Sequence, residues 1–312
     1  MENMANGNGV QRFMGWLPDR PDIRDFTVGT DTVQPKLLRL NQKDSPRAML
    51  AKAGVANGLK KKIPASIDLR KWCSPVEDQG ELGSCTAHAG IGLVEYYERK
   101  AFGRHIEASR LFLYKTTRNL IHLKGDTGAY LRSTMEAMAL FGVPPEEYWP
   151  YEVGSFEHEP TAFCYSFARN YQTLQYVRLD PPTAAKDEVL LQVKANLAAK
   201  IPAMFGFSVY DSIDQADEGG MIPFPVKGEK VLGGHAIMAV GYDDKLKIQN
   251  RNAKRGGTTT GALLIRNSWG SQWGEKGYGW LPYEYVLNGL AEDWWTALKN
   301  EWIDTGEFSL DE

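Results

Sequence analysis

Hydrophobic side chains recur every three or four positions in the earlier part of the chain, a spacing typical of helices that bury one face. Three stretches show it: residues 85–102, through Ala87, Ile91, Val94 and Tyr97; residues 131–142, through Leu131, Met135 and Met138; and a face formed by Val189, Leu190, Val193 and Leu197. Gly142 and Pro144 mark the end of the second stretch, because neither residue extends a helix readily. The pattern predicts a helix in each stretch.

The pattern changes in the second half, where short apolar runs are bounded by glycines or charged residues, as in buried strands. The runs are residues 203–209, 234–241, 262–267 and 277–281, and we interpret residues 245–260 as a polar loop between two of them. A helical part followed by a strand-rich part is typical of an α+β fold. We expect a helical lobe over about residues 63–170 and a β-rich lobe over about residues 171–300, with a cleft between them.

Residues 1–62 differ in composition from the globular domain that we predict for residues 63–312. An extended segment marked by aromatic residues and prolines runs from Gly15 to Phe26. Residues 36–62 then carry eight basic residues and one acidic residue. We interpret this basic stretch as a solvated, partly disordered linker. The alternative is a covering segment whose connection to the domain is cut.

Composition excludes several classes of function. The 312 residues are 43% hydrophobic and 24% charged, which is ordinary for a soluble globular protein. The net charge of −3 gives no basis for binding nucleic acid or a membrane through a basic surface. The chain has no run of about 18 apolar residues, and residues 1–12 lack the apolar core of a secretory signal. We expect a cytoplasmic protein, or one exported by a route without a cleavable signal peptide.

The three cysteines, Cys73, Cys85 and Cys164, are too few for a disulfide framework and suit a reducing compartment. The sequence leaves open whether Cys73 and Cys164 pair. We find no zinc-ligand spacing, phosphate-binding loop or dinucleotide fingerprint. We therefore predict that the protein uses no metal and no cofactor.

The stretch from Gln79 to Thr86 places Cys85 where a glycine-containing turn meets the first predicted helix. The positive end of a helix favours a thiolate over a thiol. Gly83 permits the turn and Ser84 can cap the helix. Gln79 lies six residues before the thiol, so its amide can fold back as a donor that stabilises an oxyanion. A buried structural cysteine is the alternative, and the turn alone leaves it open.

A thiol nucleophile needs a base and a group that orients the base. His235 is the candidate base, because it begins an apolar strand after two glycines that leave space for a close approach. Asn267 ends another apolar strand, and its side-chain oxygen can fix the imidazole tautomer. Trp269 can shield that hydrogen bond from water. A turn-forming asparagine is the alternative for Asn267.

The remaining four histidines have simpler interpretations. His88 lies one turn into the first helix, and we interpret it as structural. We expect His105, His122 and His158 at the surface, because their neighbours are polar.

Taken together, these motifs resemble the papain-like cysteine peptidases, which carry a Gln, a Gly-Ser-Cys turn, a His-Ala strand and an Asn-Ser-Trp-Gly segment in this order. The matching elements are Gln79, Gly83-Ser84-Cys85, His235-Ala236 and Asn267-Ser268-Trp269-Gly270. The resemblance covers about residues 63–300 and implies a two-lobe papain-like fold. It also implies that Cys85 is the nucleophile, His235 the base, Asn267 its orienting group and Gln79 an oxyanion donor.

The chain also departs from the pattern of the family. Leu82 stands where the family usually has a cysteine, and the usual disulfide partner of that cysteine aligns near Asp126. Thr86 replaces the aromatic residue that usually follows the nucleophile. These features, with the Gly-Trp-x-Pro-Asp segment near the N-terminus, resemble bacterial members of the xylellain type. We find no long helical propeptide pattern in residues 1–62.

The resemblance extends to substrate-binding residues. Gly128, Ala129 and Tyr130 align with a segment that pairs with the substrate backbone, and the extra Cβ of Ala129 narrows that groove. The pocket for the side chain two residues before the scissile bond is then formed by Tyr130, Leu131, Gly206 and Ala236. We expect this pocket to accept a bulky apolar or aromatic group.

The function that follows is that of a cysteine endopeptidase, which acts on polypeptides through an acyl-enzyme intermediate. Residues 1–62 form a propeptide-like arm for which we expect a place over the cleft. Two alternatives stay open: a thiol enzyme that transfers acyl groups or cleaves a special amide, and an inactive binding module on the same fold.

Overall fold

The computed structural model describes residues 12–55, 63–254 and 256–302. The α-helices are α1 (Pro35–Arg39), α2 (Pro46–Lys52), α3 (Cys85–Phe102), α4 (Arg110–Leu120), α5 (Leu131–Leu140), α6 (Ala162–Ala168), α7 (Lys186–Ala198) and α8 (Tyr283–Leu287). The strands are β1 (Ser66–Asp68), β2 (Tyr171–Arg178), β3 (Ala203–Tyr210), β4 (Val231–Gln249), β5 (Thr258–Arg266), β6 (Tyr278–Pro282) and β7 (Ala291–Trp302). Short 3₁₀ turns include η5 (Asp211–Ala216). The α+β prediction is confirmed.

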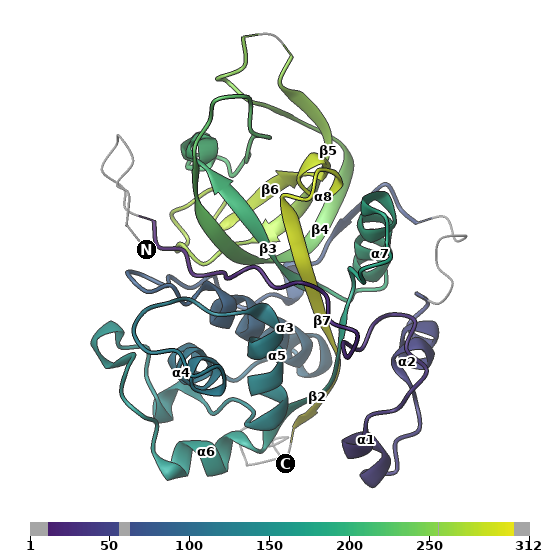
Figure 1. Ribbon diagram of the computed structural model, residues 1–312, viewed down its shortest axis with the longest axis vertical. Helices are drawn as coiled ribbons and strands as arrows, with labels where there is room; N and C mark the ends of the chain where they lie inside the picture. Colours follow the sequence, from purple (N-terminus) through teal and green to yellow (C-terminus); the bar gives the residue numbers. More distant parts are fainter. Residues whose placement is uncertain (1–11, 56–62, 255, 303–312) are drawn as a thin grey trace.

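The strands form a seven-stranded antiparallel sheet in the order β2-β7-β3-β4-β5-β6, with β1 added along β4. In Figure 1 the sheet curls into a barrel-like shape above helices α3 to α6. The pairing of β3 with β4 sets Phe207 opposite His235, and the pairing of β4 with β5 sets Met238 opposite Arg266. Asn267, the residue after β5, is therefore carried to the part of β4 that holds His235.

The central helix is α3, which contacts α4, α5 and strands β3, β4 and β7. It ends at Gly103, whose backbone φ of 76° lets its N–H donate to the carbonyl of Arg99. Ser84 occupies the N-cap position, as predicted, but its side chain does not cap the helix. Its hydroxyl is bonded instead to the hydroxyl of Tyr151, at 2.6 Å.

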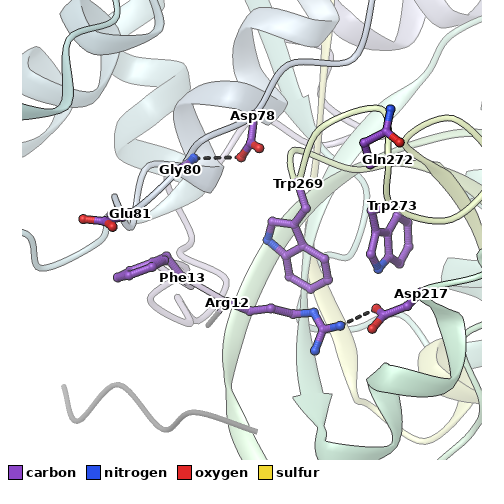
Figure 2. A pocket seen from close by; sticks show the side chains of 9 residues that line it. All are labelled: Arg12, Phe13, Asp78, Gly80, Glu81, Asp217, Trp269, Gln272 and Trp273. Carbon is purple, nitrogen blue, oxygen red and sulfur yellow. Dashed lines mark hydrogen bonds and ion pairs between the residues drawn. The ribbon is translucent and has the colours of Figure 1, made fainter. Parts of the chain in front are cut away.

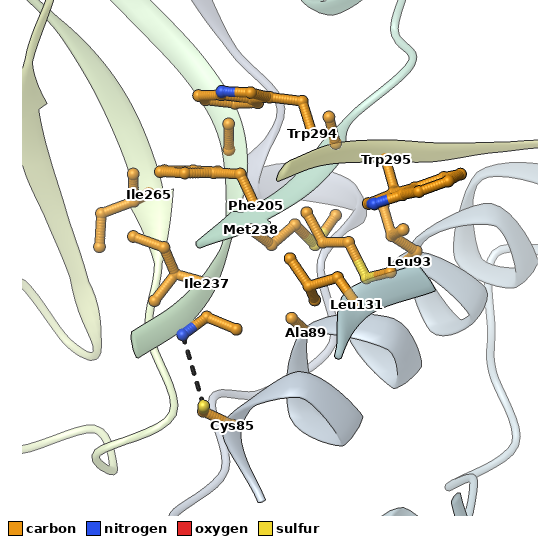
Figure 3. Packing of buried hydrophobic residues seen from close by; sticks show 14 of the residues in the cluster. Cys85, Ala89, Leu93, Leu131, Phe205, Ile237, Met238, Ile265, Trp294 and Trp295 are labelled. Carbon is orange, nitrogen blue, oxygen red and sulfur yellow. Dashed lines mark hydrogen bonds between the residues drawn. The ribbon is translucent and has the colours of Figure 1, made fainter. Parts of the chain in front are cut away.

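The hydrophobic core continues from the first turn of α3 to the centre of the sheet. Figure 3 shows Cys85 at one end of this cluster and Leu93, Met238 and Trp294 farther into it. The rings of Phe205 and Trp294 stack with their centroids 3.9 Å apart. The thiol is thus held by the packed core that joins the helices to the sheet.

The basic N-terminal stretch is more ordered than a solvated linker. Residues 35–52 include helices α1 and α2, which contact β2 and, for α2, also β7. Leu37 is fully buried, and Leu50 and Val55 pack against Ala195 and Ile201. Burial of these apolar side chains stabilises the stretch despite its charge. The lysines at 60–62 lie outside the described residues.

The predicted helix over residues 85–102 and the strands near 203–209, 262–267 and 277–281 agree closely with the structure. The predicted polar loop over residues 245–260 is too long, because β4 continues to Gln249 and β5 begins at Thr258. All three cysteines are free and buried, so Cys73 and Cys164 do not pair. Among the described helices, none combines the length and apolar character needed to cross a membrane.

Candidate active site

Cys85 is the first residue of α3, and its side chain is completely buried. Its sulfur accepts a hydrogen bond from the backbone N–H of Ala236, at 3.4 Å, as Figure 3 shows. Ala236 directly follows His235, so this contact fixes the start of the His-Ala segment against the thiol. The N-terminus of α3 adds its positive end to the same place.

His235 is held by Asn267. The imidazole Nε2 lies 2.8 Å from the Asn267 side-chain oxygen, which also accepts the backbone N–H of Ser268. Because that oxygen is only an acceptor, Nε2 carries the proton in this hydrogen bond. The other ring nitrogen, Nδ1, has no hydrogen-bond partner among the described residues. It is therefore the nitrogen left to exchange a proton with the thiol.

Trp269 covers the imidazole. Its ring stacks on that of His235 with centroids 4.5 Å apart and planes 18° from parallel. Asn267 is buried as well, so the bond between His235 and Asn267 is kept away from water. Trp269 thus lies on the imidazole that makes this bond, and its role in shielding the bond stays a prediction.

Gln79 is oriented by Ser268. The hydroxyl of Ser268 donates to the Gln79 side-chain oxygen at 2.6 Å, and the backbone N–H of Gln79 donates to the carbonyl of Ser268 at 2.9 Å. The amide nitrogen must then point the other way. It donates to the carbonyls of Leu82, at 2.8 Å, and Phe13, at 3.0 Å. The Asn-Ser-Trp-Gly segment thus positions both the base and the amide donor.

Burial changes the pKa values of the Cys85 thiol and the His235 imidazole. It raises the pKa of Cys85 to about 11, opposed by backbone N–H groups including those of Ala236 and Gly15. It lowers the pKa of His235 to about 4, opposed by the hydrogen bond to Asn267. Both groups are therefore neutral near pH 7. The lowered thiol pKa expected from the sequence is not found here, because the site is shut off from water.

The N-terminal arm, which we define as residues 12–55, contacts the residues around the thiol. In Figure 1 its first part passes between the helical part and the barrel-like sheet, and α1 and α2 lie to one side. Trp16 forms a parallel bridge with Ala129: the Ala129 N–H donates to the carbonyl of Gly15, and the Leu17 N–H donates to the carbonyl of Ala129. On the opposite side, the Trp16 N–H donates to Gly234. The arm is thus bonded to both walls.

The indole of Trp16 fills a pocket whose wall is made of glycine. A Cβ added to Gly206 would lie 1.9 Å from the ring, and one added to Gly234 would lie 2.8 Å from it. At the floor, the indole N–H donates to the carboxylate of Asp293 at 3.1 Å. Asp293 is fully buried, and Arg178 lies 3.2 Å from its other oxygen. Burial raises the pKa of Asp293 to about 7, against the opposing effect of Arg178.

The residues predicted to bind substrate lie in different relations to this pocket. Gly206 forms its wall, Ala129 pairs with the arm, and a Cβ on Gly128 would collide with the Gly15 carbonyl. Tyr130 is half-buried as the N-cap of α5, and Leu131 begins that helix inside the core. Ala236 touches the thiol through its backbone. The Cβ of Ala129 does not prevent strand pairing.

The position of the missing disulfide holds a hydrogen bond instead. Both carboxylate oxygens of Asp126 accept the backbone N–H of Gly83, at 2.9 and 3.0 Å. The hydroxyl of Tyr114 donates to the same carboxylate at 2.5 Å. A charge-assisted hydrogen bond therefore ties residue 126 to the turn beside Leu82.

Histidines outside the site have structural contacts. His88 is buried with its Nδ1 3.1 Å from the carbonyl of Ser84, and burial lowers its pKa to about 3. His122 and His158 are exposed, as expected. His105 is half-buried, with its Nε2 2.8 Å from a carboxylate oxygen of Glu107, so the expectation of a surface position holds only in part.

A group of three possible metal ligands, Glu95, His105 and Glu107, lies away from the thiol. Its donor atoms already have protein partners: Ser74 donates to Glu95, and the Nε2 of His105 lies 2.8 Å from Glu107. These contacts account for the cluster without an ion.

Sequence reasoning missed the residues that hold the two ends of the arm segment in the site. These are Asp293 at the Trp16 end and Asp214 and Asp217 at the Arg12 end. An available signal for Asp293 is an acid placed directly before Trp294 and Trp295 in an apolar run, since a buried charge needs a partner.

Arg12 forms ion pairs with Asp214 and Asp217, and its guanidinium lies 5.4 Å from the centroid of the Trp269 ring. Figure 2 shows Arg12 with Asp217 and Trp269 at one side of a pocket, whose volume is about 520 Å³. The pocket is also lined by Trp273 and Gln272. It therefore adjoins the tryptophan that covers His235.

Comparisons with known proteins agree with this geometry. A family model described as papain family cysteine protease matches residues 63–293. An uncharacterized peptidase C1-like protein of Acanthamoeba polyphaga mimivirus is 31% identical over 297 residues, 92% of this chain and 86% of that protein. Cathepsin K of Gallus gallus is 29% identical over 226 residues, 70% of this chain and 58% of that protein.

Among solved structures, xylellain, a cysteine protease from Xylella fastidiosa, matches with a TM-score of 0.68 and 31% identity. The match covers 97% of this chain and 98% of that one, a share that necessarily includes most of residues 1–62. Bromelain of Ananas comosus, at 22% identity and a TM-score of 0.55, shares the fold. The chain belongs to the papain family of cysteine proteases, and it is a peptidase that hydrolyses peptide bonds.

Proposed function

We propose that Cys85, His235, Asn267 and Gln79 are the catalytic residues of this endopeptidase, and that arm residues 12–17 hold it in an inactive, covered state. The observation that carries the catalytic assignment is the hydrogen bond from His235 Nε2 to Asn267. It leaves Nδ1 as the proton acceptor beside a cysteine at a helix N-terminus.

In the uncovered enzyme, Nδ1 of His235 takes the thiol proton and the Cys85 sulfur attacks the peptide carbonyl carbon. The carbonyl oxygen becomes an oxyanion that the Gln79 amide and the backbone N–H of Cys85 stabilise, each donor contributing roughly 3–4 kcal/mol. His235 then gives its proton to the leaving amine as the C–N bond breaks. Water, deprotonated by His235, hydrolyses the thioester and restores the thiol.

The contacts of the arm support its inhibitory role. The carbonyl of Phe13 accepts the Gln79 amide donor that the oxyanion would need. We expect a substrate to bind with its second residue before the scissile bond between Ala129 and Gly206, and with its chain running on past Cys85 toward the leaving side. The arm runs the opposite way, from Arg12 past the thiol to Trp16. Its carbonyl carbons are therefore not presented for attack, and it blocks the site as an inhibitor.

The pocket that holds Trp16 supports a preference of the enzyme for substrates with a bulky aromatic side chain two residues before the scissile bond. An indole fits between Gly206 and Gly234 and reaches Asp293. Equal cleavage of peptides with Trp, Leu, Asp and Lys at that position would contradict this preference.

The test of the catalytic assignment uses the full chain with Trp16→Ala, so that the site is accessible. A thiol-directed epoxide should label this protein at one site, and a fluorogenic peptide library should be cleaved. Cys85→Ala should abolish both, whereas Cys73→Ala and Cys164→Ala should preserve both. Labelling that survives Cys85→Ala would refute the assignment. Adding amine acceptors to the assay distinguishes hydrolysis from acyl transfer, since the same acyl-enzyme serves either acceptor.

A further inference from the structure

We infer that Asp214 and Asp217 form a subsite for an arginine or lysine side chain on the leaving-group side of the scissile bond. Arg12 of the arm occupies this subsite in the covered state. The inference rests on the proposed function and adds a substrate class to it: polypeptides with a basic residue shortly after the cleaved bond.

The side of the site is fixed by the course of the arm. Trp16 fills the pocket assigned to the side chain two residues before the scissile bond, and the Gly15 N–H faces the sulfur of Cys85. Arg12 lies at the other end of this segment, beyond the Phe13 carbonyl that meets Gln79. Its subsite is therefore across the thiol from the Trp16 pocket, where the leaving peptide must lie.

The chemistry of the subsite suits a basic side chain, and a planar guanidinium best of all. Nη1 of Arg12 is paired with Asp214 and Nη2 with Asp217, so each nitrogen of one guanidinium meets a separate carboxylate. The guanidinium also lies over the Trp269 ring, which adds a cation–π contact. The side chain of Arg12 is only 5% exposed, whereas those of Asp214 and Asp217 are 31% and 39% exposed. The guanidinium of Arg12 is therefore almost buried, whereas solvent still reaches the two carboxylates that bind it.

The pocket beside this subsite is also lined by negatively charged side chains. Figure 2 shows Asp78, Glu81 and Asp217 around it. Among its described lining residues, the only cation is Arg12, which comes from the arm. When the arm leaves, the carboxylates of Asp78, Glu81 and Asp217 lose the nearby Arg12 cation, and a basic residue of the substrate would replace that positive charge. An acidic residue at the same place would be repelled.

The experiment compares internally quenched peptides with Trp two residues before the cleaved bond. Each pair differs only by arginine or citrulline, its uncharged analogue of nearly equal shape, at the first, second or third residue after the bond. The enzyme is the full chain with Trp16→Ala, and mass spectrometry locates the cleaved bond. We expect kcat/KM to favour arginine by about 2- to 5-fold at one of these positions, the size of effect expected when solvent reaches the carboxylates of the pair.

The matched variant adds Asp214→Asn and Asp217→Asn, which keep the side-chain shape and remove the charge. We expect the ratio of arginine to citrulline to fall to about 1, and the single variant Asp217→Asn to give an intermediate ratio. Because both peptides are measured with the same enzyme, the ratio of their kcat/KM values does not depend on how much of that enzyme is folded or still covered by the arm. A peptide with glutamate at the same position should be cleaved more slowly than the citrulline peptide, with the difference lost in the double variant.

Efficient cleavage with a ratio near 1 at all three positions would overturn the subsite and leave the proposed function intact. The same holds if the ratio persists in the double variant, because another group would then recognise arginine. Absence of both cleavage and Cys85 labelling would instead refute the proposed function itself.

Discussion

The two ends of the arm segment that crosses the site are held by different forces. At one end, the indole of Trp16 is 4% exposed and lies against Gly206 and Gly234, so shape and apolar burial dominate. At the other end, Arg12 is held by two carboxylates that solvent reaches. Backbone hydrogen bonds to Ala129 and Gly234 also fix the Trp16 end, and between the two ends the carbonyl of Phe13 accepts the Gln79 side-chain amide.

This difference predicts unequal contributions to covering. Truncation of a buried aromatic side chain to alanine typically costs 3–5 kcal/mol, whereas a solvent-accessible ion pair contributes about 0.2–1 kcal/mol. Release of the Trp16 end should therefore open the site, and release of the Arg12 end should only loosen it. Added salt should weaken the binding of the Arg12 end, which depends on charge, and should leave the binding of the Trp16 end nearly unchanged.

The largest expected effect comes from Trp16→Ala in the full chain. Loss of about 3 kcal/mol would raise activity on a small fluorogenic peptide by about 100-fold, if the covered state dominates beforehand. Trp16→Phe is the matched control, because it keeps a six-membered ring in the pocket and removes the five-membered ring whose N–H donates to Asp293. We expect the activity of Trp16→Phe to lie between that of the unmodified chain and that of Trp16→Ala. Equal activity of all three proteins would reduce the arm to a tether.

A second expectation concerns the pH dependence of thiol labelling, measured with iodoacetamide in a Cys73→Ala, Cys164→Ala background. Burial raises the pKa of Cys85 to about 11, so the covered chain holds little thiolate at pH 7. Its labelling rate should rise about tenfold per pH unit between roughly pH 7 and 10, as expected for a thiol well below its pKa. With Trp16→Ala the thiolate should form at lower pH and the rate should level off earlier. Superimposable pH profiles would mean that the arm does not control the thiol.

The proposed catalytic residues could be named from the sequence because each lies in a local pattern that indicates its chemistry. Cys85 begins a periodic helix, His235 begins an apolar run that lies inside β4, since that strand already starts at Val231, and Asn267 directly follows β5. Their meeting in space depends on the register of β4 and β5, which the sequence alone does not state. The resemblance to a family supplied that long-range information.

Elements whose buried side chains are charged were missed. Helix α4 contains Arg118, which is fully buried because Glu157 and the carbonyl of Gly125 bind its guanidinium. Strand β7 contains Asp293, buried beside Arg178. A hydrophobic pattern treats charge as exposure, so it fails where partners distant in sequence neutralise that charge. An arm over the cleft was predicted, but the pocket that holds its Trp16 depends on Gly206 and Gly234, which lie about 200 residues later in the chain.

A third variant, Gly206→Ala, separates the shape of the Trp16 pocket from the arm itself. The added Cβ would lie 1.9 Å from the indole, so the ring must move out. Overpacking of this kind costs about 1–3 kcal/mol, and we expect epoxide labelling of Cys85 to rise roughly 10-fold. Cleavage of peptides with Trp two residues before the bond should fall, because the same Cβ obstructs them. Gly154→Ala is the control, since nothing lies within 4 Å of its added Cβ.

The smallest expected effect comes from Arg12→Gln, which removes the charge and leaves Trp16 seated. Activity on a small peptide should rise by only about 2- to 5-fold, the factor expected for a solvent-accessible ion pair, and added salt should raise the unmodified chain toward the variant. Arg12→Lys keeps the charge and loses the paired geometry, so it should lie between them. If Arg12→Gln opened the site as fully as Trp16→Ala, the two ends would act as one cooperative unit. Apolar burial at Gly206 would then be unable to hold the arm alone, and the comparison between shape and charge would fail.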